Sequence, residues 1–277
     1  MIIDTHTHVV SSDKAKHPLA PEARGWSTEV SNDVEDLITE MDRAGVECAT
    51  LVQPNGTYGL DNLYQCDSAK AYTPRTVAVG ILDPAALDAA DKLSYWVNEH
   101  GMYGVRLQSQ AEADDPKCDA LWKRAENLGI PISIGGGGQP DKVDRMRKVG
   151  ERHPNVIFAP DHFAGWSGAE DKAAMTLALE SMAKLPNAYL RVSSTSLGPY
   201  VGLEQSEKDL FKRVIEAFTP QRVMWGSNFP GTREGGYTGL VRLGQTALDW
   251  LSGDDLDWIM GKTAHKLWPM LQAPATG

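Results

Sequence analysis

The chain has 277 residues, of which 42% are hydrophobic and 23% charged, and 27 basic against 37 acidic residues give a formal net charge of −10. This composition argues against a disordered chain and is sufficient for one barrel-sized domain. The acidic balance argues against a nucleic acid or an anionic membrane as the main partner, because both attract basic surfaces. A small anionic molecule is compatible with it, since a few local arginines can bind one.

No apolar run is long enough to span a membrane, and the N-terminus lacks the basic start and apolar stretch of a signal peptide. We therefore expect a soluble, cytoplasmic protein without a membrane partner. Cys48, Cys66 and Cys118 are odd in number and have no CxxC spacing, which predicts reduced thiols rather than disulfides or a thiolate metal site.

Short apolar segments alternate eight times with longer amphipathic ones. The predicted strands are Met1–His6, Val46–Gln53, Thr76–Leu82, Tyr103–Gln108, Pro131–Gly135, Val156–His162, Ala188–Ser193 and Arg222–Asn228. The predicted helices are Asp33–Ala44, Asn62–Tyr72, Ala86–His100, Pro116–Leu128, Lys142–Arg152, Glu170–Lys184, Gln205–Phe218 and Leu240–Leu251. Strands separated by helices run parallel, so the pattern predicts a single-domain (β/α)₈ TIM barrel over residues 1–277, with a doubly wound open sheet as the alternative.

Helix boundaries carry recognisable start and stop residues. Ser31, Asn32 and Asp33 are candidate N-caps for the first helix. Gly45, Gly101 and Gly129 follow apolar-periodic segments where a helix would end in a left-handed residue. The segment Asp254–Trp268 is predicted to form an extra helix that closes the barrel.

Histidine and carboxamide or carboxylate residues end three of the predicted strands. His6 and His8 follow the first strand, and a side-chain period of two places them on one face with Asp4. Asp161 and His162 end the sixth strand and Asn228 ends the eighth. Because barrel active sites form at the C-terminal ends of strands, His6, His8, His162, Asn228 and Asp161 are the predicted catalytic residues. The structural alternatives are hydrogen-bonded loop histidines, an Asp161 helix cap and a turn at Asn228.

Five further residues are predicted to bind substrate. Arg106 and Gln108 alternate on the fourth strand and Arg191 lies on the seventh; a buried arginine needs a carboxylate, of the protein or of a ligand. Tyr58 and Trp166 follow the second and sixth strands, where they could wall a pocket for a planar substrate or simply pack. Motifs for binding nucleotide phosphates are missing from the sequence.

Four motifs in chain order resemble the amidohydrolase superfamily. They are His6-Thr7-His8, Asp161-His162, Gly226-Ser227-Asn228-Phe229-Pro230 and the terminal segment Gly261–Trp268. The resemblance covers Ile3 to Trp268 and is strongest to the short branch that contains 2-pyrone-4,6-dicarboxylate lactonase, sugar lactonases and related decarboxylases. It implies a (β/α)₈ barrel. Homo-oligomerisation is a further family expectation.

Metal-dependent members of this superfamily hold a divalent ion with first-strand histidines, a fifth-strand histidine and an eighth-strand aspartate. His6, His8 and His162 match the histidine pattern, but Gly135 stands where the fifth-strand histidine is expected and Asn228 where the aspartate is expected. The pyrone lactonase branch is metal-independent, which agrees with the missing histidine. An amide is no base, so the aspartate's role in accepting a proton from water must pass to another group.

The resemblance therefore implies a hydrolase that opens a lactone of a small carboxylated substrate without a cofactor. His6, His8 and His162 would polarise the carbonyl, Arg106 would hold a substrate carboxylate, and a neutral histidine or Asp161 would be the base while Asn228 orients water. One alternative is a divalent metal such as zinc on His6, His8 and His162, supporting hydrolysis or decarboxylation of an aromatic acid. Another is a barrel that binds a ligand without catalysis.

Overall fold

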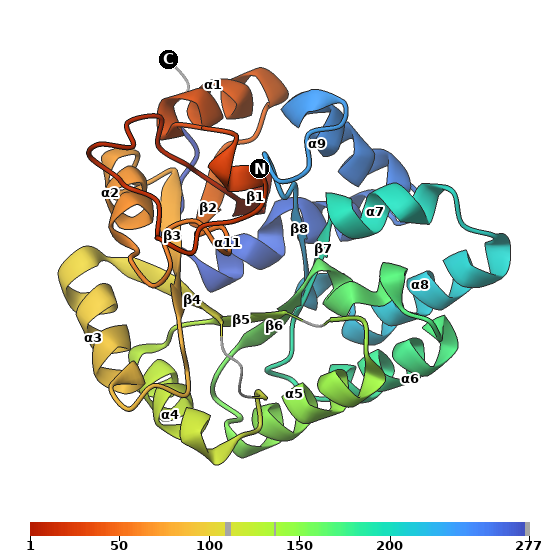
Figure 1. Ribbon diagram of the computed structural model, residues 1–277. Coiled ribbons are helices and arrows are strands. Elements are labelled where there is room, and N and C mark those ends of the chain that lie inside the picture. Colours follow the sequence, from red (N-terminus) through yellow and green to blue (C-terminus); the bar gives the residue numbers. More distant parts are fainter. Residues whose placement is uncertain (109–111, 136, 275–277) are drawn as a thin grey trace.

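Parallel strands form the centre of the molecule, and helices cover their outer side (Figure 1). The computed structural model describes residues 1–108, 112–135 and 137–274. The strands are β1 (Ile3–Thr7), β2 (Cys48–Val52), β3 (Thr76–Leu82), β4 (Met102–Leu107), β5 (Ile132–Gly135), β6 (Phe158–Asp161), β7 (Leu190–Ser193) and β8 (Val223–Gly226). The outer helices are α1 (Val34–Ala44), α2 (Leu63–Ala71), α3 (Ala89–His100), α4 (Asp119–Leu128), α5 (Pro140–Arg152), α6 (Lys172–Ala183), α8 (Gln205–Phe218) and α9 (Gly236–Ala247).

The strands are hydrogen-bonded in two groups. Strands β1 to β6 form a curled sheet in sequence order, and β7 pairs with β8. A parallel bridge between Phe158 and Ala188 joins the groups on one side. On the other side, the Asn228 N–H donates to the His6 carbonyl at 2.8 Å. The eight predicted strands and their parallel direction are confirmed, whereas one continuous eight-stranded ladder is not present in the described residues.

Left-handed glycines end three of the outer helices, as predicted. Gly45, Gly101 and Gly129 have φ angles of 71°, 68° and 66° and follow α1, α3 and α4. Glycine suits these positions because a Cβ would be strained there. The predicted Asp33 cap is wrong in its chemistry: Asp33 occupies the N-cap position of α1, but its carboxylate accepts the backbone N–H of Ser12 instead.

The helical segments depart from prediction near the C-terminal ends of β7 and β8. A short helix, α7 (Ser194–Val201), directly follows β7, and α9 begins at Gly236 rather than at Leu240. The predicted extra helix at the C-terminus is present as α10 (Gly253–Asp257), a π-helical turn (Trp258–Lys262) and α11 (Thr263–Leu267). Among the described residues, every helix is too short or too polar to cross a bilayer.

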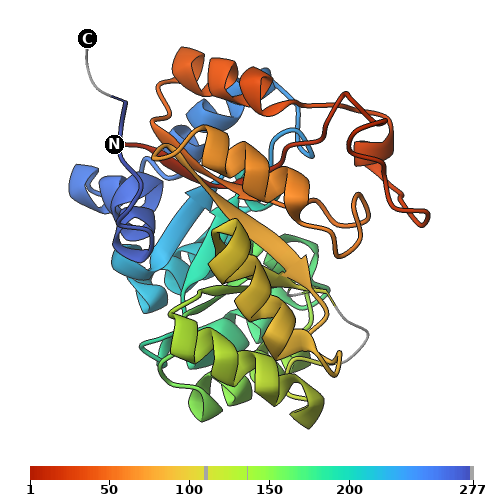
Figure 2. The ribbon, with the colours of Figure 1, turned by 90° about the vertical axis from the view of Figure 1, so that its left-hand side faces the viewer.

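Two apolar clusters stabilise this arrangement. The larger one joins the strands to the outer helices and includes Cys66 and Cys118. All three cysteines are buried free thiols, as predicted. The smaller one combines residues near the N-terminal ends of the strands with the C-terminal segment: Ile3, Cys48, Val77, Ala159, Tyr189, Met224, Ala264, Trp268 and Leu271. Met1 and the last described residues lie at this end, while the long loop after β1 extends at the opposite end (Figure 2). The interior near the N-terminal ends of the strands is therefore filled by apolar side chains.

The contact between β8 and β1 leaves no room for a side chain at Gly226. A Cβ at this position would lie 2.6 Å from the Cβ of His6 and 3.0 Å from its backbone nitrogen. We expect Gly226→Ala to lower the free energy of unfolding by about 1–3 kcal/mol, because the strands must move apart. Urea denaturation would measure this. Gly253→Ala is the control, since its Cβ would meet nothing within 4 Å; equal stability of both variants would contradict the prediction.

Candidate active site

The three predicted histidines meet at the C-terminal ends of β1 and β6. The ring of His6 lies 4.9 Å from that of His8 and 4.6 Å from that of His162, measured between centroids. His6 and His8 are buried, and His162 is partly exposed. A small molecule that reaches this group from solvent therefore meets His162 first.

Asp4 does not belong to this group, contrary to the prediction from strand periodicity. Between Asp4 and Thr7, β1 contains one residue more than the paired segment of β2, so the alternation of faces is interrupted. The buried Asp4 carboxylate accepts hydrogen bonds from the Ser227 N–H at 2.9 Å and the Tyr237 hydroxyl at 3.0 Å. It thus ties β1 to β8 and α9, while His6 turns toward the other histidines.

Asp161 is held between two arginines below the histidines. Its Oδ1 accepts a hydrogen bond from Nη1 of Arg191, and its Oδ2 lies 3.1 Å from Nε of Arg106. Arg191 also donates to the hydroxyls of Thr5 and Ser133, at 3.1 and 2.9 Å. Burial opposes ionisation of Asp161, but Arg191 and Arg106 outweigh it and hold its pKa below the usual value. The carboxylate that Arg106 was predicted to meet is thus one of the protein's own.

The histidines are neutral at pH 7. Burial lowers the pKa of His8 and of His162 to about 4 and takes the pKa of His6 well below its usual value. The charge of Arg106 acts in the same direction on all three. Each ring therefore presents one N–H donor and one lone pair.

Hydrogen bonds fix which nitrogen of His8 carries its proton. Its Nδ1 lies 2.7 Å from the carbonyl of Val52, which can only accept, so the lone pair of neutral His8 is on Nε2. This atom lies 3.2 Å from Oδ1 of Asn228, whose amide is oriented by donation from Nδ2 to the Thr232 hydroxyl at 2.9 Å. In this tautomer both atoms are acceptors, and they are close enough for one water molecule to contact both.

Backbone strain is concentrated at the same site. His162, Phe163 and Ala164 have φ angles of 53°, 56° and 54°, followed by Gly165 at 79°, and Asn228 has a φ of 60°. Residues with a side chain rarely adopt this left-handed conformation, and it clusters at functional sites where the surrounding structure enforces it. The sharp turns that it produces place His162 and Asn228 at the ends of β6 and β8.

The structure places the remaining predicted residues differently. Gln108 lines a cavity of about 470 Å³ at the ends of β4 and β5. Trp166 is fully buried and its indole N–H donates to Thr176, and the hydroxyl of buried Tyr58 accepts the Ser11 N–H at 2.9 Å. Both aromatic residues are therefore engaged in packing.

Sequence reasoning missed Ser193, whose hydroxyl lies 2.8 Å from Nδ1 of His162. Its position could have revealed it, because Ser193 ends the seventh strand just as Asp161 ends the sixth. Thr5 and Ser133 carried no such signal. Their role depends on Arg191, whose reach across the interior is not a local property of the sequence.

The histidines as placed do not form a metal centre. In residues 1–108, 112–135 and 137–274, no group of three or more His, Cys, Asp or Glu side chains is arranged to hold an ion. Within the same ranges both ring nitrogens of buried His6 lack a hydrogen-bond partner, so that ring is available to a ligand.

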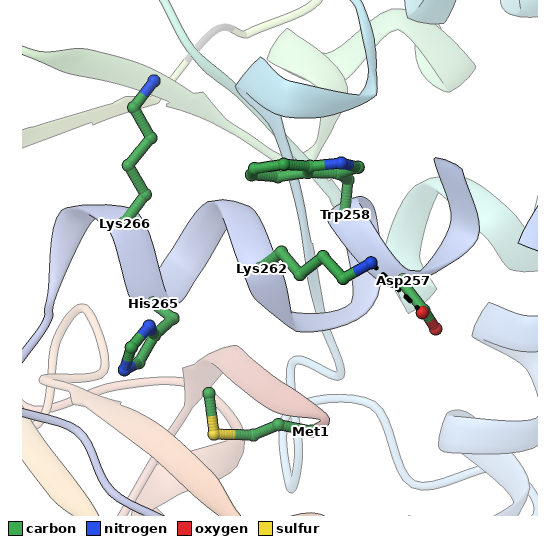
Figure 3. Close-up of a pocket in the computed structure, with 6 residues that line it drawn as sticks. All are labelled: Met1, Asp257, Trp258, Lys262, His265 and Lys266. Atoms are coloured by element: carbon green, nitrogen blue, oxygen red, sulfur yellow. Dashed lines mark ion pairs between the residues drawn. The ribbon is translucent and has the colours of Figure 1, made fainter. Parts of the chain in front are cut away.

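Another cavity, of about 420 Å³, lies at the N-terminal end of the strands (Figure 3). It is lined by Met1, Asp257, Trp258, Lys262, His265 and Lys266. Lys262 is paired with Asp254 and Asp257, at 2.6 and 3.3 Å. This end of the fold carries none of the predicted catalytic residues.

An amidohydrolase family model matches residues 3–270. The chain belongs to the amidohydrolase family. It is 26% identical over 217 residues to an L-fucono-1,5-lactonase of Burkholderia ambifaria, covering 74% of this chain and 72% of the relative. It is 24% identical over 233 residues to a 4-sulfomuconolactone hydrolase of Rhizobium radiobacter, covering 82% and 75%. A Pseudomonas putida structure described as a 2-pyrone-4,6-dicarboxylic acid hydrolase shares the fold, with a TM-score of 0.75, 18% identity and 98% of each chain covered. The predicted family and enzyme class, a hydrolase, are confirmed.

Removing the charge of Asp161 should destabilise the fold. Asp161→Asn leaves Arg106 and Arg191 in the interior without a counter-charge, and we expect the free energy of unfolding to fall by about 3 kcal/mol. Urea denaturation at pH 7 would measure it. Asp88→Asn is the control, because Asp88 pairs with Lys92 at the surface and should change stability by less than about 1 kcal/mol. A similar small effect for both variants would contradict the interior pairing.

Acidification should destabilise the protein through its neutral histidines. His8 takes up a proton near pH 6.5 when unfolded, but its pKa in the folded protein is about 4. The unfolded chain therefore binds more protons in this window, and stability falls as the pH drops from about 6.5 to 4, by roughly 3 kcal/mol for this residue. In urea denaturation at several pH values, His8→Gln should show a smaller loss of unfolding free energy between pH 6.5 and 4 than wild type. His100→Gln, which lies outside the site, should show the same loss as wild type. Equal slopes for His8→Gln and wild type would show that His8 is not a buried neutral group.

Proposed function

We propose that the chain adds water to a lactone of a small carboxylated molecule and opens its ring. The observation that carries this proposal is the pair of acceptors, His8 Nε2 and Asn228 Oδ1, 3.2 Å apart beside two further neutral imidazoles. The names of the two lactone-hydrolysing relatives support the substrate class.

In the first step, water donates hydrogen bonds to His8 and Asn228 and its oxygen attacks the lactone carbonyl carbon. The proton passes to Nε2 of His8, which is free to accept it because this ring is neutral at pH 7. Asn228 is no base, so its role is to orient the water.

The carbonyl oxygen gains negative charge in that step and needs donors nearby. His6 has no hydrogen-bond partner on either ring nitrogen among the described residues, so it can donate one N–H to this oxygen. His162, whose other nitrogen is held by Ser193, is the second candidate donor. When the ring C–O bond breaks, the leaving oxygen takes the proton from His8, and the products are an alcohol and a carboxylic acid that releases its remaining proton to solvent at pH 7.

The arginines have unequal roles in this proposal. Arg191 has three protein partners and positions Asp161. Arg106 uses Nε for Asp161, and its remaining N–H donors can meet a substrate carboxylate. Asp161, paired with both, is a positioning residue rather than the base, and Tyr58 and Trp166 shape the site through packing.

Substitution of the histidines tests the mechanism. On a panel of sugar lactones and carboxylated pyrones, we expect His8→Gln and His6→Ala to lower kcat/KM by about 100-fold or more, the scale typical for general bases and oxyanion donors. His100→Gln, which removes a ring bonded to Tyr95 outside the site, should keep wild-type turnover. Unchanged turnover in His6→Ala and His8→Gln would overturn the proposal.

The alternative of a divalent ion on His6, His8 and His162 makes a different prediction. It rests on the family pattern and on the free nitrogens of His6. Bound metal would polarise the carbonyl or support decarboxylation of an aromatic acid. Metal analysis of protein purified without chelator, combined with turnover before and after chelation, separates the two: a stoichiometric metal whose removal abolishes turnover favours the alternative.

A further inference from the structure

We propose that the cavity between the ends of β3, β4 and β5 binds an anionic group of the substrate, with Lys142 as its cation and Gly135 providing the space. This inference rests on the proposed function and specifies which group of the substrate the protein binds away from the reacting carbonyl. The cavity measures about 470 Å³, and its lining includes Asn55, Gln108, Gly135 and Lys142.

The strand register places one wall of the cavity next to β6, the strand that ends just before His162. Gly135 pairs with Asp161 on the neighbouring strand, and His162 follows Asp161 directly. Gln108 directly follows β4, two residues beyond Arg106, and its N–H donates to the Leu82 carbonyl at the end of β3. A substrate whose reacting carbonyl lies at the histidines can therefore extend past Arg106 into this cavity.

Nothing in the backbone requires glycine at position 135. Its φ angle is not in the left-handed region, and a Cβ there would meet no atom within 4 Å. By contrast, the Cβ of an alanine at Gly226 would clash with His6. The absence of a side chain at position 135 therefore opens space at the end of β5, where the cavity lies.

Lys142 supplies a cation that the protein leaves uncompensated. Lys142 is partly buried, and among the described residues no carboxylate forms an ion pair with it. Its Nζ lies 3.4 Å from the Cβ position of Gly137, and the adjacent Gly138 N–H donates to the carbonyl of Ala164 in the turn that carries His162. The ammonium thus borders the loop that contacts the catalytic turn.

The other polar lining groups indicate what surrounds the anion. Oε1 of Gln108 is buried without a hydrogen-bond partner in the described ranges, so it can accept from a hydroxyl group of a ligand. Glu112 also lines the cavity, but its side chain is exposed. Solvent therefore screens the interaction of Glu112 with a bound anion more than that of the partly buried Lys142. The preferred ligand is therefore a hydroxylated or cyclic carboxylate with one anionic group near Lys142.

Glutarate binding, measured by titration calorimetry, tests the role of Lys142 independently of turnover. We expect Lys142→Met to weaken glutarate binding at least tenfold. The matched control is Lys148→Met on the same helix, because Lys148 pairs with Asp144 at 3.0 Å and does not line the cavity. Equal binding by Lys142→Met and wild type, or no binding by wild type, overturns the inference.

Kinetics test the same cavity with substrate. For a carboxylated lactone, Lys142→Met should raise KM at least tenfold with kcat within about twofold, and for neutral δ-valerolactone it should change neither. Gly135→Leu should raise KM for the carboxylated lactone and for δ-valerolactone by filling the cavity, and Gly135→Ala should raise it less.

If wild type binds glutarate through Lys142 but hydrolyses no lactone, the proposed function fails and this inference stands. If wild type hydrolyses lactones and Lys142→Met has the same KM and kcat as wild type for the carboxylated and the neutral lactone, only this inference fails.

Discussion

The buried pairing of Asp161 with Arg106 and Arg191 is the interaction on which the site depends. Charges can be held inside a protein only when they are paired and hydrogen-bonded. Arg191 on β7 reaches Thr5 on β1, Ser133 on β5 and Asp161 on β6, and Arg106 joins from β4. Five strands are thereby fixed to one another directly beneath the histidines. The same group is costly to break, because removing any charge leaves another without its partner.

This network also sets the protonation of the site. Within this network, two guanidinium groups and one carboxylate leave an excess of one positive charge beside the histidines. That excess adds to burial in keeping His6, His8 and His162 neutral, so that their lone pairs are available at pH 7. The network therefore does more than hold the strands in place: its arginines add to the effect of burial on the pKa of each ring, whereas Asp161 opposes burial at His162.

The sequence predicted the parts of this arrangement that are local. Strand ends that carry His6, Asp161, His162 and Asn228 are visible as polar residues after apolar runs, and the C-terminal ends of parallel strands necessarily meet. The extra residue in β1 was not predictable, because a bulge is set by pairing with β2, and it removed Asp4 from the expected face. The destination of Arg191 was also hidden, since its partners lie up to 186 residues away in sequence.

The charge of this network bears on why position 228 carries an amide rather than a carboxylate. An aspartate there would neutralise the excess positive charge and would be ready to take a proton from water. Asn228 does neither, and in the proposed mechanism the proton goes to His8, whose lone pair is placed on Nε2 by the hydrogen bond of Nδ1 to the Val52 carbonyl. The positive charge then stays unbalanced until a ligand arrives. A carboxylated substrate would supply the missing negative charge near Arg106 or Lys142, and its binding would raise the pKa of nearby His8 toward the range in which a histidine is an effective base. Substrate binding and activation of the base would thus be coupled through the same electrostatic balance.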